Sequence, residues 1–429
     1  MEYCARCLYP ANAKPTIIFD EEGVCSGCRY HESRSKLEVG WEERARRLEK
    51  ILDEAREAAR KRGNAHDCIV PVSGGKDSHF QVWLLKEKYG LNPLLVTFNH
   101  VFNQPSGLRN LANLVEKSGC DLIRFTAGPD SVRKIARHML ERVGDLTWHY
   151  HAGIRTLPFQ IAVKYNIPLI VWGEHGFAEL TGLVTLEDFV EFTKWTRKEH
   201  DMRGLEAHDL VGKNGITERD VAAYVFPSDE QIERVGVRGI YLSNFYYWDA
   251  KHQGELMMEK WGFAPIAFER ERTFNLYAKI DDHANDVHDY LKYLKFGYGR
   301  ATDDATMEIR HGRMTREEGV EMVRRYDTRE PSTLPMYCDF LEISVADFYR
   351  IVEPMRDARI WEKTNGEWHP RDSIVKHPIG PREEAVRVPQ VNDRTLSPKN
   401  RQLYYNPVCP PPKTGDPDLD QPARRFRVA

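Results

Sequence analysis

The chain has 429 residues, of which 41% are hydrophobic and 30% are charged, and its formal net charge is −3. This composition is ordinary for a globular protein with more than one folded unit. The slight acidic excess makes a nucleic-acid partner unlikely, because such partners usually bind a clustered basic surface. No apolar run reaches the roughly 18 residues of a membrane-spanning helix, and the N-terminus lacks the features of a secretory signal. We therefore expect a cytoplasmic protein with no membrane partner.

The first 35 residues hold four of the eight cysteines and show little hydrophobic periodicity, which predicts a small separate module. Residues 41–62 are rich in Glu, Arg, Lys, Ala and Leu at helical spacing. They predict a surface helix within a linker that spans residues 36–65.

Residues 66–330 alternate short apolar runs with segments of helical periodicity. The runs predict strands at 68–72, 94–98, 122–125, 167–172 and 239–242. The periodic segments predict helices at 78–89, 107–118, 129–143, 152–165, 249–261, 283–296 and 315–327. This alternation predicts an α/β fold with a doubly wound parallel sheet covered by helices on both faces.

Two stretches depart from this alternation. Residues 176–237 are polar and charged, and we expect an insertion near the carboxyl edge of the sheet. Residues 331–429 are expected to form a C-terminal extension, in which proline and charge accumulate from about residue 366. This composition predicts an extended tail.

A glycine-rich loop follows the first predicted strand directly and precedes a predicted helix. Its residues are Ser73, Gly74, Gly75, Lys76, Asp77 and Ser78. Glycines allow a tight turn whose N–H groups face an anion, and the helix adds its positive N-terminal end. The serines can donate hydroxyl hydrogen bonds, Lys76 supplies charge, and Asp77 can cap the helix or hold Mg²⁺. The alternative is a surface Gly-Gly turn capped by Ser and Asp.

The loop does not fit two better-known phosphate motifs. A Walker A loop would need Gly at position 70 and Ser or Thr at position 77, where Val70 and Asp77 stand. A dinucleotide fingerprint would need a third glycine.

A strand, the sequence Ser-Gly-Gly-x-Asp-Ser and a helix together resemble the pyrophosphate loop of the N-type ATP pyrophosphatases. These enzymes bind the leaving pyrophosphate of ATP and transfer AMP to a substrate oxygen. The resemblance implies an ATP site whose adenine lies near the end of the second strand, at Thr97, Phe98 and Asn99. It also implies a site after the fourth strand, at Gly173 and Glu174. Glu174 is a candidate ligand for Mg²⁺ or substrate, or else a solvated loop acid.

Four cysteines have the spacing of a zinc site. Cys4-x-x-Cys7 is followed after 17 residues by Cys25-x-x-Cys28, and four thiolates suit a closed, structural Zn²⁺ site. A redox pair or an iron–sulfur cluster is the alternative. The sequence Gly-x-Cys-x-Gly at residues 23–27 is also the pattern of a glutaminase nucleophile turn, but it follows a turn rather than a strand. We therefore expect the chain not to make its own ammonia.

Two wider segments are similar to the N-acetyl sugar amidotransferase family of bacterial surface-polysaccharide pathways. They are residues 3–28, which contain the cysteines, and residues 294–318, which contain Phe-Gly-Tyr-Gly-Arg-Ala-Thr-Asp-Asp. The resemblance implies that ATP adenylates the acetamido oxygen of a nucleotide-activated sugar and that ammonia displaces AMP. A separate glutaminase and channel subunit pair would deliver the ammonia.

Four further residues are candidates with open alternatives. Arg300 and Asp303 can contact phosphate or sugar, or else they are a surface charge at a helix end and an N-cap. His149 and His151 stand where the resemblance implies a cysteine pair. They can bind metal or substrate, although satisfied surface or cleft histidines are the simpler reading.

Two other functions remain open. A tRNA-modifying thiolase or ligase would use the same adenylation, but a thiolase needs a reactive cysteine, and Cys68 and Cys120 are expected to be buried. A scaffold that only binds nucleotide is the third possibility.

Overall fold

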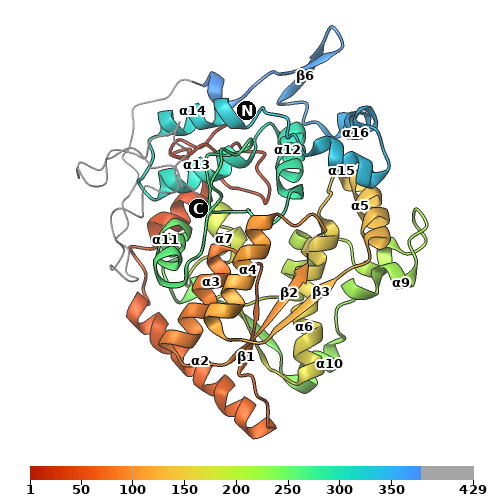
Figure 1. Cartoon of the computed structure of the whole chain (residues 1–429). Coiled ribbons are helices and arrows are strands. Elements are labelled where there is room, and N and C mark those ends of the chain that lie inside the picture. Colours follow the sequence, from red (N-terminus) through yellow and green to blue (C-terminus); the bar gives the residue numbers. More distant parts are fainter. Residues whose placement is uncertain (100, 378–429) are drawn as a thin grey trace.

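A computed structural model gives the structure of residues 1–99 and 101–377. Its centre is a five-stranded parallel sheet with the strand order β3-β2-β1-β4-β5 (Figure 1). The strands are β1 (Cys68–Pro71), β2 (Pro93–Asn99), β3 (Leu122–Thr126), β4 (Leu169–Trp172) and β5 (Arg238–Tyr241). The doubly wound parallel sheet expected from the sequence is confirmed.

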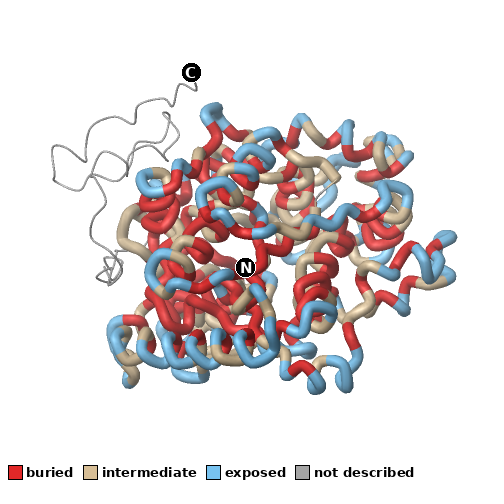
Figure 2. Tube along the Cα trace, turned by 60° about the horizontal axis from the view of Figure 1, so that its bottom comes forward, coloured by how far each residue is buried: buried red, intermediate tan, exposed pale blue. Residues whose placement is uncertain are grey.

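Successive residues of β1 face opposite sides of the sheet, as a strand requires. Cys68 and Val70 belong to one buried cluster, and Ile69 belongs to another. The first cluster includes residues of α2 (Trp41–Arg62), α3 (Lys76–Trp83), α4 (Pro105–Ser118) and α11 (Ala250–Trp261). The second includes residues of α5 (Pro129–Val143) and α6 (Trp148–Tyr165). Helices therefore cover both faces, and the buried segments lie inside an exposed outer layer (Figure 2).

The chain order of the strands places a switch point beside β1. From β1 the chain moves to β2 and β3 on one side, and then returns to β4 and β5 on the other. Open parallel sheets bind ligands outside the carboxyl ends of the strands at such a point. The glycine-rich loop after β1 and the turn after β4 both lie there.

Most helix boundaries agree with the periodicity of the sequence, with three exceptions. Helix α3 begins at Lys76 and ends in a π-helical turn, Leu84–Lys88. Helix α6 begins at Trp148 rather than at residue 152. Helix α13 (Arg300–Arg310) was not predicted, because polar residues interrupt its apolar stripe. Those polar residues are buried in the fold.

The segment between β4 and β5 has a polar composition, but it contributes several apolar side chains to the core. It forms α7 (Gly176–Thr181), α8 (Lys194–Thr196), α9 (Glu218–Val221) and α10 (Asp229–Val235). Leu210, Val221 and Tyr224 join the same buried cluster as α6. The segment therefore covers part of the sheet as well as lying near its carboxyl edge.

The remaining elements lie at the two ends of the chain. They are α1 (Ser26–Ser33), α12 (Ala284–Phe296), α14 (Arg316–Tyr326), α15 (Leu334–Leu341), α16 (Val345–Val352), β6 (Trp361–Thr364) and β7 (Glu367–Pro370). At the start of the tail that was expected to run extended from about residue 366, the strand β7 pairs with β6. Its remainder, residues 378–429, lies outside the described residues. Within the described part of the chain, no helix is long and apolar enough to cross a membrane.

Candidate functional site

The glycine-rich loop turns directly from β1 into α3. Gly75 is the N-cap of the helix, so the expectation that Asp77 caps it is wrong. The Oγ atom of Ser78 accepts a hydrogen bond from the Ser73 N–H at 3.0 Å, and the Oγ atom of Ser73 accepts one from the Gly75 N–H at 3.3 Å. The two serines thus hold the loop in shape. The first N–H groups of a helix have no partner inside it, so those of Lys76 and Asp77 point out of the helix at the loop.

Gly74 is required by its conformation and by its neighbour. Its φ is 84°, in the left-handed region that favours glycine. A Cβ atom at this position would lie 2.6 Å from the backbone nitrogen of Leu111 in α4. The loop therefore packs against α4 through a backbone contact that leaves no room for a side chain.

A cavity of about 400 Å³ opens beside this loop, and its walls come from distant parts of the chain. One wall is formed by Ser73, Gly74, Gly75, Lys76 and Asp77, with Gly107, Asn110 and Glu174 beside them. A second group of lining residues comes from the segment before α12 and from α13 and the turn after it: Asn275, Tyr277, Ala278, Lys279, Ile280, Asp281, Arg300, Asp304, Met307, Glu308, His311 and Arg313. The remaining lining residues are Tyr150, Ile154, Glu179, Leu180, Ala250 and Lys251. The cavity thus lies between the carboxyl edge of the sheet and helix α13.

Charges at the loop are tightly coupled. The ammonium group of Lys76 forms an ion pair with Asp77 and lies 5.7 Å from the ring centre of Tyr277. Burial lowers the pKa of Lys76, but the carboxylates of Asp77 and Glu174 outweigh it, so the net shift is upward. Glu174 faces the open cavity. Desolvation by the surrounding protein, followed by the charge of Asp77, raises its pKa to about 7. One cation and two converging carboxylates suit a site for a phosphate chain with Mg²⁺.

Helix α13 presents one face to the cavity. Arg300, Asp304, Met307, Glu308 and His311 recur at the spacing of one helical stripe and all line it. This spacing can be seen in the sequence, but Arg300 is the only one of these five residues that was predicted as a site residue. The side chain of Arg300 is only 13% exposed, so it is not the exposed surface charge that was the alternative to a ligand contact.

The segment before α12 contributes cavity residues that were not predicted from the sequence, and Lys279 is the most informative of them. Lys279 lines the cavity with a φ of 51°, which is rare for a residue with a side chain. Its pKa is lowered, first by burial and then by the charge of Arg300. Strained backbone of this kind clusters at functional sites. No motif in the sequence marked this lysine.

Several predicted site residues do not reach the cavity. Thr97 and Phe98 are buried in β2, where the ring of Phe98 packs against Tyr224. Asn99 accepts a hydrogen bond from Arg124 instead. The adenine position expected from the resemblance therefore stays a prediction, with no cavity lining to support it.

Three other candidates lie just outside the lining. Ser78 shapes the loop from below, as described above. Gly173 packs against Gln81, where a Cβ atom would lie 2.0 Å from the amide nitrogen. Asp303 points away from the cavity and accepts a hydrogen bond from the hydroxyl of Tyr9 at 3.0 Å. Asp303 is not an N-cap, because Gly299 holds that position in α13.

His149 and His151 lie in the first turn of α6, where His149 is buried and His151 is half-buried. Nδ1 of His151 lies 3.1 Å from the hydroxyl oxygen of Thr147, and Nδ1 of His288 lies at the same distance from it. Burial lowers the pKa of His151 well below its usual value and that of His288 to about 3. Neutral histidines packed around a threonine are the simplest interpretation of this cluster.

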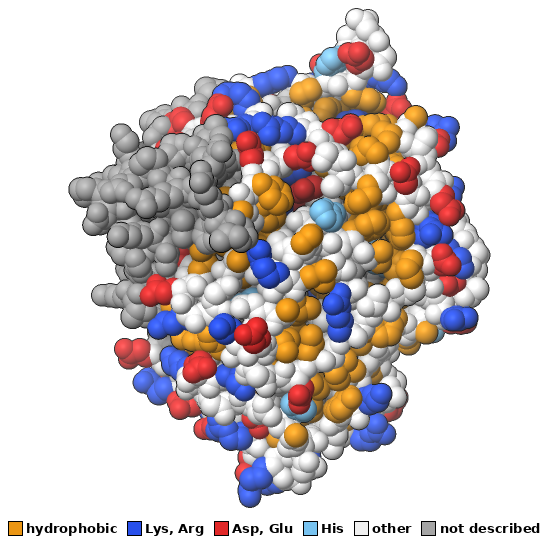
Figure 3. All heavy atoms as spheres, viewed as in Figure 1, with side chains coloured by type: hydrophobic (Ala, Val, Ile, Leu, Met, Phe, Trp, Pro, Cys, Tyr) orange, Lys and Arg blue, Asp and Glu red, His pale blue; other side chains and the backbone are white. Residues whose placement is uncertain are grey.

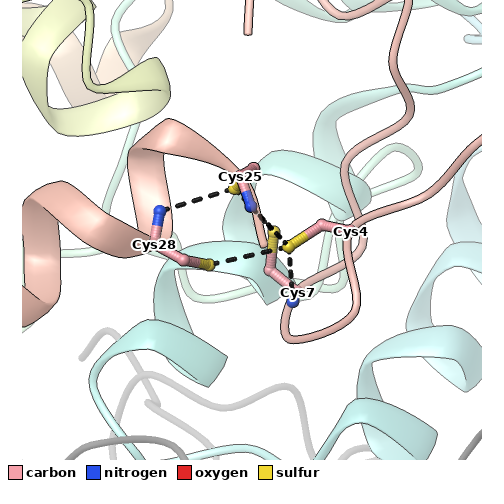
Figure 4. Close-up of side chains that lie close together, drawn as sticks. All are labelled: Cys4, Cys7, Cys25 and Cys28. Carbon is pink, nitrogen blue, oxygen red and sulfur yellow. Dashed lines mark hydrogen bonds between the residues drawn. The ribbon is translucent and has the colours of Figure 1, made fainter. Parts of the chain in front are cut away.

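The four cysteines of the N-terminal module converge as predicted (Figure 4). Cys25 and Cys28 lie at the start of α1, and Cys4 and Cys7 lie in the preceding loop. The Sγ atoms of Cys4 and Cys28 are 3.9 Å apart, and those of Cys7 and Cys25 are 3.6 Å apart. All four sulfur atoms lie within 4.8 Å of one another, and all four side chains are buried.

This geometry fits one tetrahedral ion. Zn–S bonds of about 2.3 Å place the sulfur atoms of a tetrahedral site about 3.8 Å apart. A four-iron cluster would spread the sulfur atoms farther, because each binds a different iron. The residues present therefore fit a single metal ion, which the four thiolates would enclose without an open position.

The other buried cysteines offer no reactive thiol at the cavity. Cys68 is fully buried in β1, and burial raises its pKa. Cys120 is 4% exposed, and burial raises its pKa too. Neither lines the cavity, so the expectation that both are buried is confirmed.

The doubly wound sheet, the Ser-Gly-Gly loop at its switch point and the carboxylate after β4 are arranged as the resemblance to a pyrophosphate loop implies. Residues 271–373 match the family model "LPS biosynthesis protein WbpG-like, C-terminal domain". This segment of the chain is thus similar to that C-terminal domain, which bears out the resemblance to a surface-polysaccharide family found in the sequence. The match extends on both sides of residues 294–318, where the resemblance was found in the sequence, and it includes the cavity-lining residues from Asn275 to Arg313.

A curated relative and two solved structures were also found. An uncharacterized protein of Methanocaldococcus jannaschii is 29% identical over 120 residues, which are 28% of this chain and 41% of the relative. The chain therefore spans less than half of the relative that it matches. NMN synthetase from Francisella tularensis is 14% identical, over 52% of this chain and 97% of that one, with a TM-score of 0.26. The U34-tRNA thiolase NcsA from Methanococcus maripaludis, solved with its 4Fe-4S cluster, is 15% identical, over 44% of this chain and 63% of that one, with a TM-score of 0.23.

Proposed function

We propose that the chain is an ATP-dependent amidotransferase of surface-polysaccharide synthesis. Its substrate would be a nucleotide-activated N-acetyl sugar, and its products an acetamidino sugar, AMP and pyrophosphate. One observation carries this proposal. The cavity has the phosphate-type loop, Ser73 to Asp77, on one wall and the WbpG-like domain on the other.

The chemistry proceeds in two balanced steps. The acetamido oxygen attacks the α-phosphorus of ATP, a new oxygen–phosphorus bond forms, and the bond to the bridging oxygen of pyrophosphate breaks. Ammonia then adds to the activated carbon, AMP leaves with the former amide oxygen, and the nitrogen loses a proton. An amide oxygen is a poor leaving group until it carries AMP, which is why the first step is needed.

The loop supplies what the first step requires. The N–H groups at the start of α3 and the ammonium of Lys76 would stabilise the charge that builds on the departing pyrophosphate. Asp77 and Glu174 are the carboxylates that would hold Mg²⁺, and the ion would neutralise the phosphate chain of ATP. The enclosed thiolate site would hold Zn²⁺ with a structural role.

The cavity wall of the WbpG-like domain would bind the sugar. It offers carboxylates, a histidine and arginines, and these polar groups suit a polyhydroxylated ligand. Asp304 and Glu308 are two of the carboxylates that line it. Ammonia would come from a separate glutaminase and channel subunit pair.

The test is incubation of the full chain with ATP, Mg²⁺, ammonium and a panel of nucleotide-activated acetamido sugars. Replacement of an oxygen by an NH group makes the product about one mass unit lighter, and AMP should form in equal amount. Failure to form AMP with every sugar of the panel would argue against the proposal.

The tRNA-modifying alternative is not favoured. Cys68 and Cys120 are buried away from the cavity. The face drawn in Figure 3 also intersperses acidic and basic side chains and shows no continuous basic surface. Salt-sensitive retention of tRNA by the chain would revive this alternative.

A further inference from the structure

Arg310, the last residue of α13, joins the cysteine centre to the cavity wall. Its Nη2 atom donates to the Sγ atom of Cys25 at 3.4 Å. Its Nη1 atom donates to the backbone oxygen atoms of Glu179 at 3.0 Å and Leu180 at 2.7 Å. Glu179 and Leu180 both line the cavity. A single buried guanidinium thus contacts a metal-binding sulfur on one side and the lining of the substrate site on the other.

The acceptors around Arg310 show that the four-cysteine centre would supply the negative charge that its guanidinium needs. Among the described residues its hydrogen bonds reach carbonyl oxygens and sulfur atoms, none of them a carboxylate. A buried cation needs a nearby negative charge. Four thiolates around one divalent ion carry a net charge of about −2, and this charge lies against the guanidinium. The guanidinium also packs closely against α1, since a Cβ atom on Gly27 would lie 2.2 Å from Nη2 of Arg310.

Helix α13 itself lies between the module and the cavity. One face carries the cavity residues, as described above. The other face carries Ala301, Ala305 and Ile309, which pack in one buried cluster with Leu8 of the module. The position of the cavity wall is therefore set by what α13 packs against on its far side.

Helix α7 is held from the same module. Arg34, which follows α1, forms an ion pair with the carboxylate of Glu179. The hydroxyl of Tyr30 donates to that carboxylate at 3.2 Å, and the hydroxyl of Ser26 donates to the backbone oxygen of Thr181 at 2.5 Å. Since Cys25 and Cys28 lie at the start of α1, a metal ion held by these cysteines would orient the helix that leads to these contacts.

We propose that Arg310 is a positioning residue through which the four-cysteine centre fixes the cavity wall made by α7 and α13. The four-cysteine centre would affect the sugar-binding wall, because Arg310 connects it to α13 and α7. It would not affect the ATP loop, because Ser73, Ser78 and α4 hold that loop in shape. The consequence for turnover rests on the proposed function, whereas the structural coupling does not.

The test is amide hydrogen exchange on the full, metal-loaded chain. In Arg310→Met, exchange in residues 176–182 and 300–311 should quicken at least about tenfold, and exchange in residues 68–83 should change less than about twofold. Removal of the metal from the wild-type chain should give the same pattern. Arg310→Lys should also quicken exchange, because a lysine keeps the charge but cannot bridge a sulfur and two carbonyls.

Arg316→Met is the matched control. Arg316 donates to the backbone oxygen atoms of Cys7 and Cys4, both at 3.2 Å, but it does not line the cavity. Its loss should leave exchange in residues 176–182 and 300–311 within about twofold of the wild type. The proposal is overturned if Arg310→Met and Arg316→Met behave alike, or if residues 68–83 quicken as much as the cavity wall.

A kinetic measurement separates this proposal from the proposed function. Arg310→Met should raise the KM for the nucleotide sugar at least about tenfold and leave the KM for ATP within about twofold. An equal rise in both constants would count against a selective effect on the sugar wall. A wild-type chain that shows the exchange pattern but amidates no sugar would refute the proposed function and leave the coupling intact.

Discussion

Arg300 donates two hydrogen bonds to the carboxylate of Asp289, from Nε at 2.9 Å and from Nη2 at 3.0 Å. The pair joins the start of α13 to α12 and lies beside the cavity. Burial opposes the charged form of Asp289, but Arg300 and Lys279 outweigh it, and the pKa of this carboxyl lies well below its usual value. The cationic side chain at the cavity is therefore held in place by a buried anion behind it.

Asp289→Asn should be strongly destabilising. The change removes the carboxylate that accepts both hydrogen bonds from the buried Arg300 and leaves, among the described residues, only its ion pair with Asp303, at 3.3 Å. Loss of one partner of a buried pair costs up to about 3–5 kcal/mol. Urea denaturation measures the change in the free energy of unfolding. Asp53→Asn removes an exposed partner of Arg56 and should have little effect. Equal effects of the two substitutions would contradict the importance of the buried pair.

Gly74→Ala should abolish AMP formation. The new Cβ atom would collide with the backbone of Leu111, and the residue would have to keep a φ of 84°. We expect a loss of at least about a hundredfold in kcat, the size seen when a site loses its preorganised donors. Gly176→Ala is the control, because its Cβ atom would have no neighbour within 4 Å. Pyrophosphate release is the measurement, and near wild-type release by Gly74→Ala would refute the role of the turn.

Ser73→Ala and Asp77→Ala should each remove AMP formation without unfolding the chain. The first loses the acceptor that holds the Gly75 N–H, and the second loses the partner of Lys76 and a candidate Mg²⁺ ligand. Ser35→Ala, at an exposed serine that only caps its own turn, should keep full activity. Circular dichroism would check folding, and wild-type turnover in either loop variant would exclude the loop from the reaction.

Replacement of both Cys4 and Cys7 by Ser should release the metal ion and lower stability. Folding energy and metal binding are coupled in closed thiolate sites. Elemental analysis should find about one zinc ion in the wild-type chain and none in the double variant. Cys338→Ser, at a buried cysteine outside the cluster, should retain the metal. A full metal content in the double variant would show that the cysteines are not its ligands.

Activity should fall below about pH 7 through Glu174. Its pKa is raised to about 7, so the carboxylate becomes protonated as the pH falls through that value. A carboxylate that binds Mg²⁺ or substrate must be ionised, so kcat/KM for ATP should rise with pH up to about 7 and then level. The concentration of free ammonia also rises with pH. Dividing kcat/KM of the wild type by kcat/KM of Glu174→Gln at each pH removes this effect. A ratio that does not depend on pH would mean that ionisation of Glu174 is not used.

The sequence by itself determined the sheet, the loop and the metal site. Five apolar runs separated by helical segments predict a parallel sheet covered on both faces, since parallel strands need crossover connections that are usually helical. The Ser-Gly-Gly loop and the two CxxC pairs are local patterns, and each specifies its own geometry over a few residues. These features were therefore predicted without knowledge of the contacts between distant segments.

Only the tertiary structure decided which residues meet at the cavity. Polar residues interrupt the apolar stripe of helix α13, so apolar periodicity did not predict the helix, and no sequence motif marks Lys279. Thr97 and Phe98 belong to a local pattern but are buried on opposite faces of β2, where Phe98 packs in one cluster with α6 and the β4–β5 segment. The link from Cys25 through Arg310 to Glu179 joins three segments far apart in the chain, and such contacts depend on packing that no short stretch of sequence specifies.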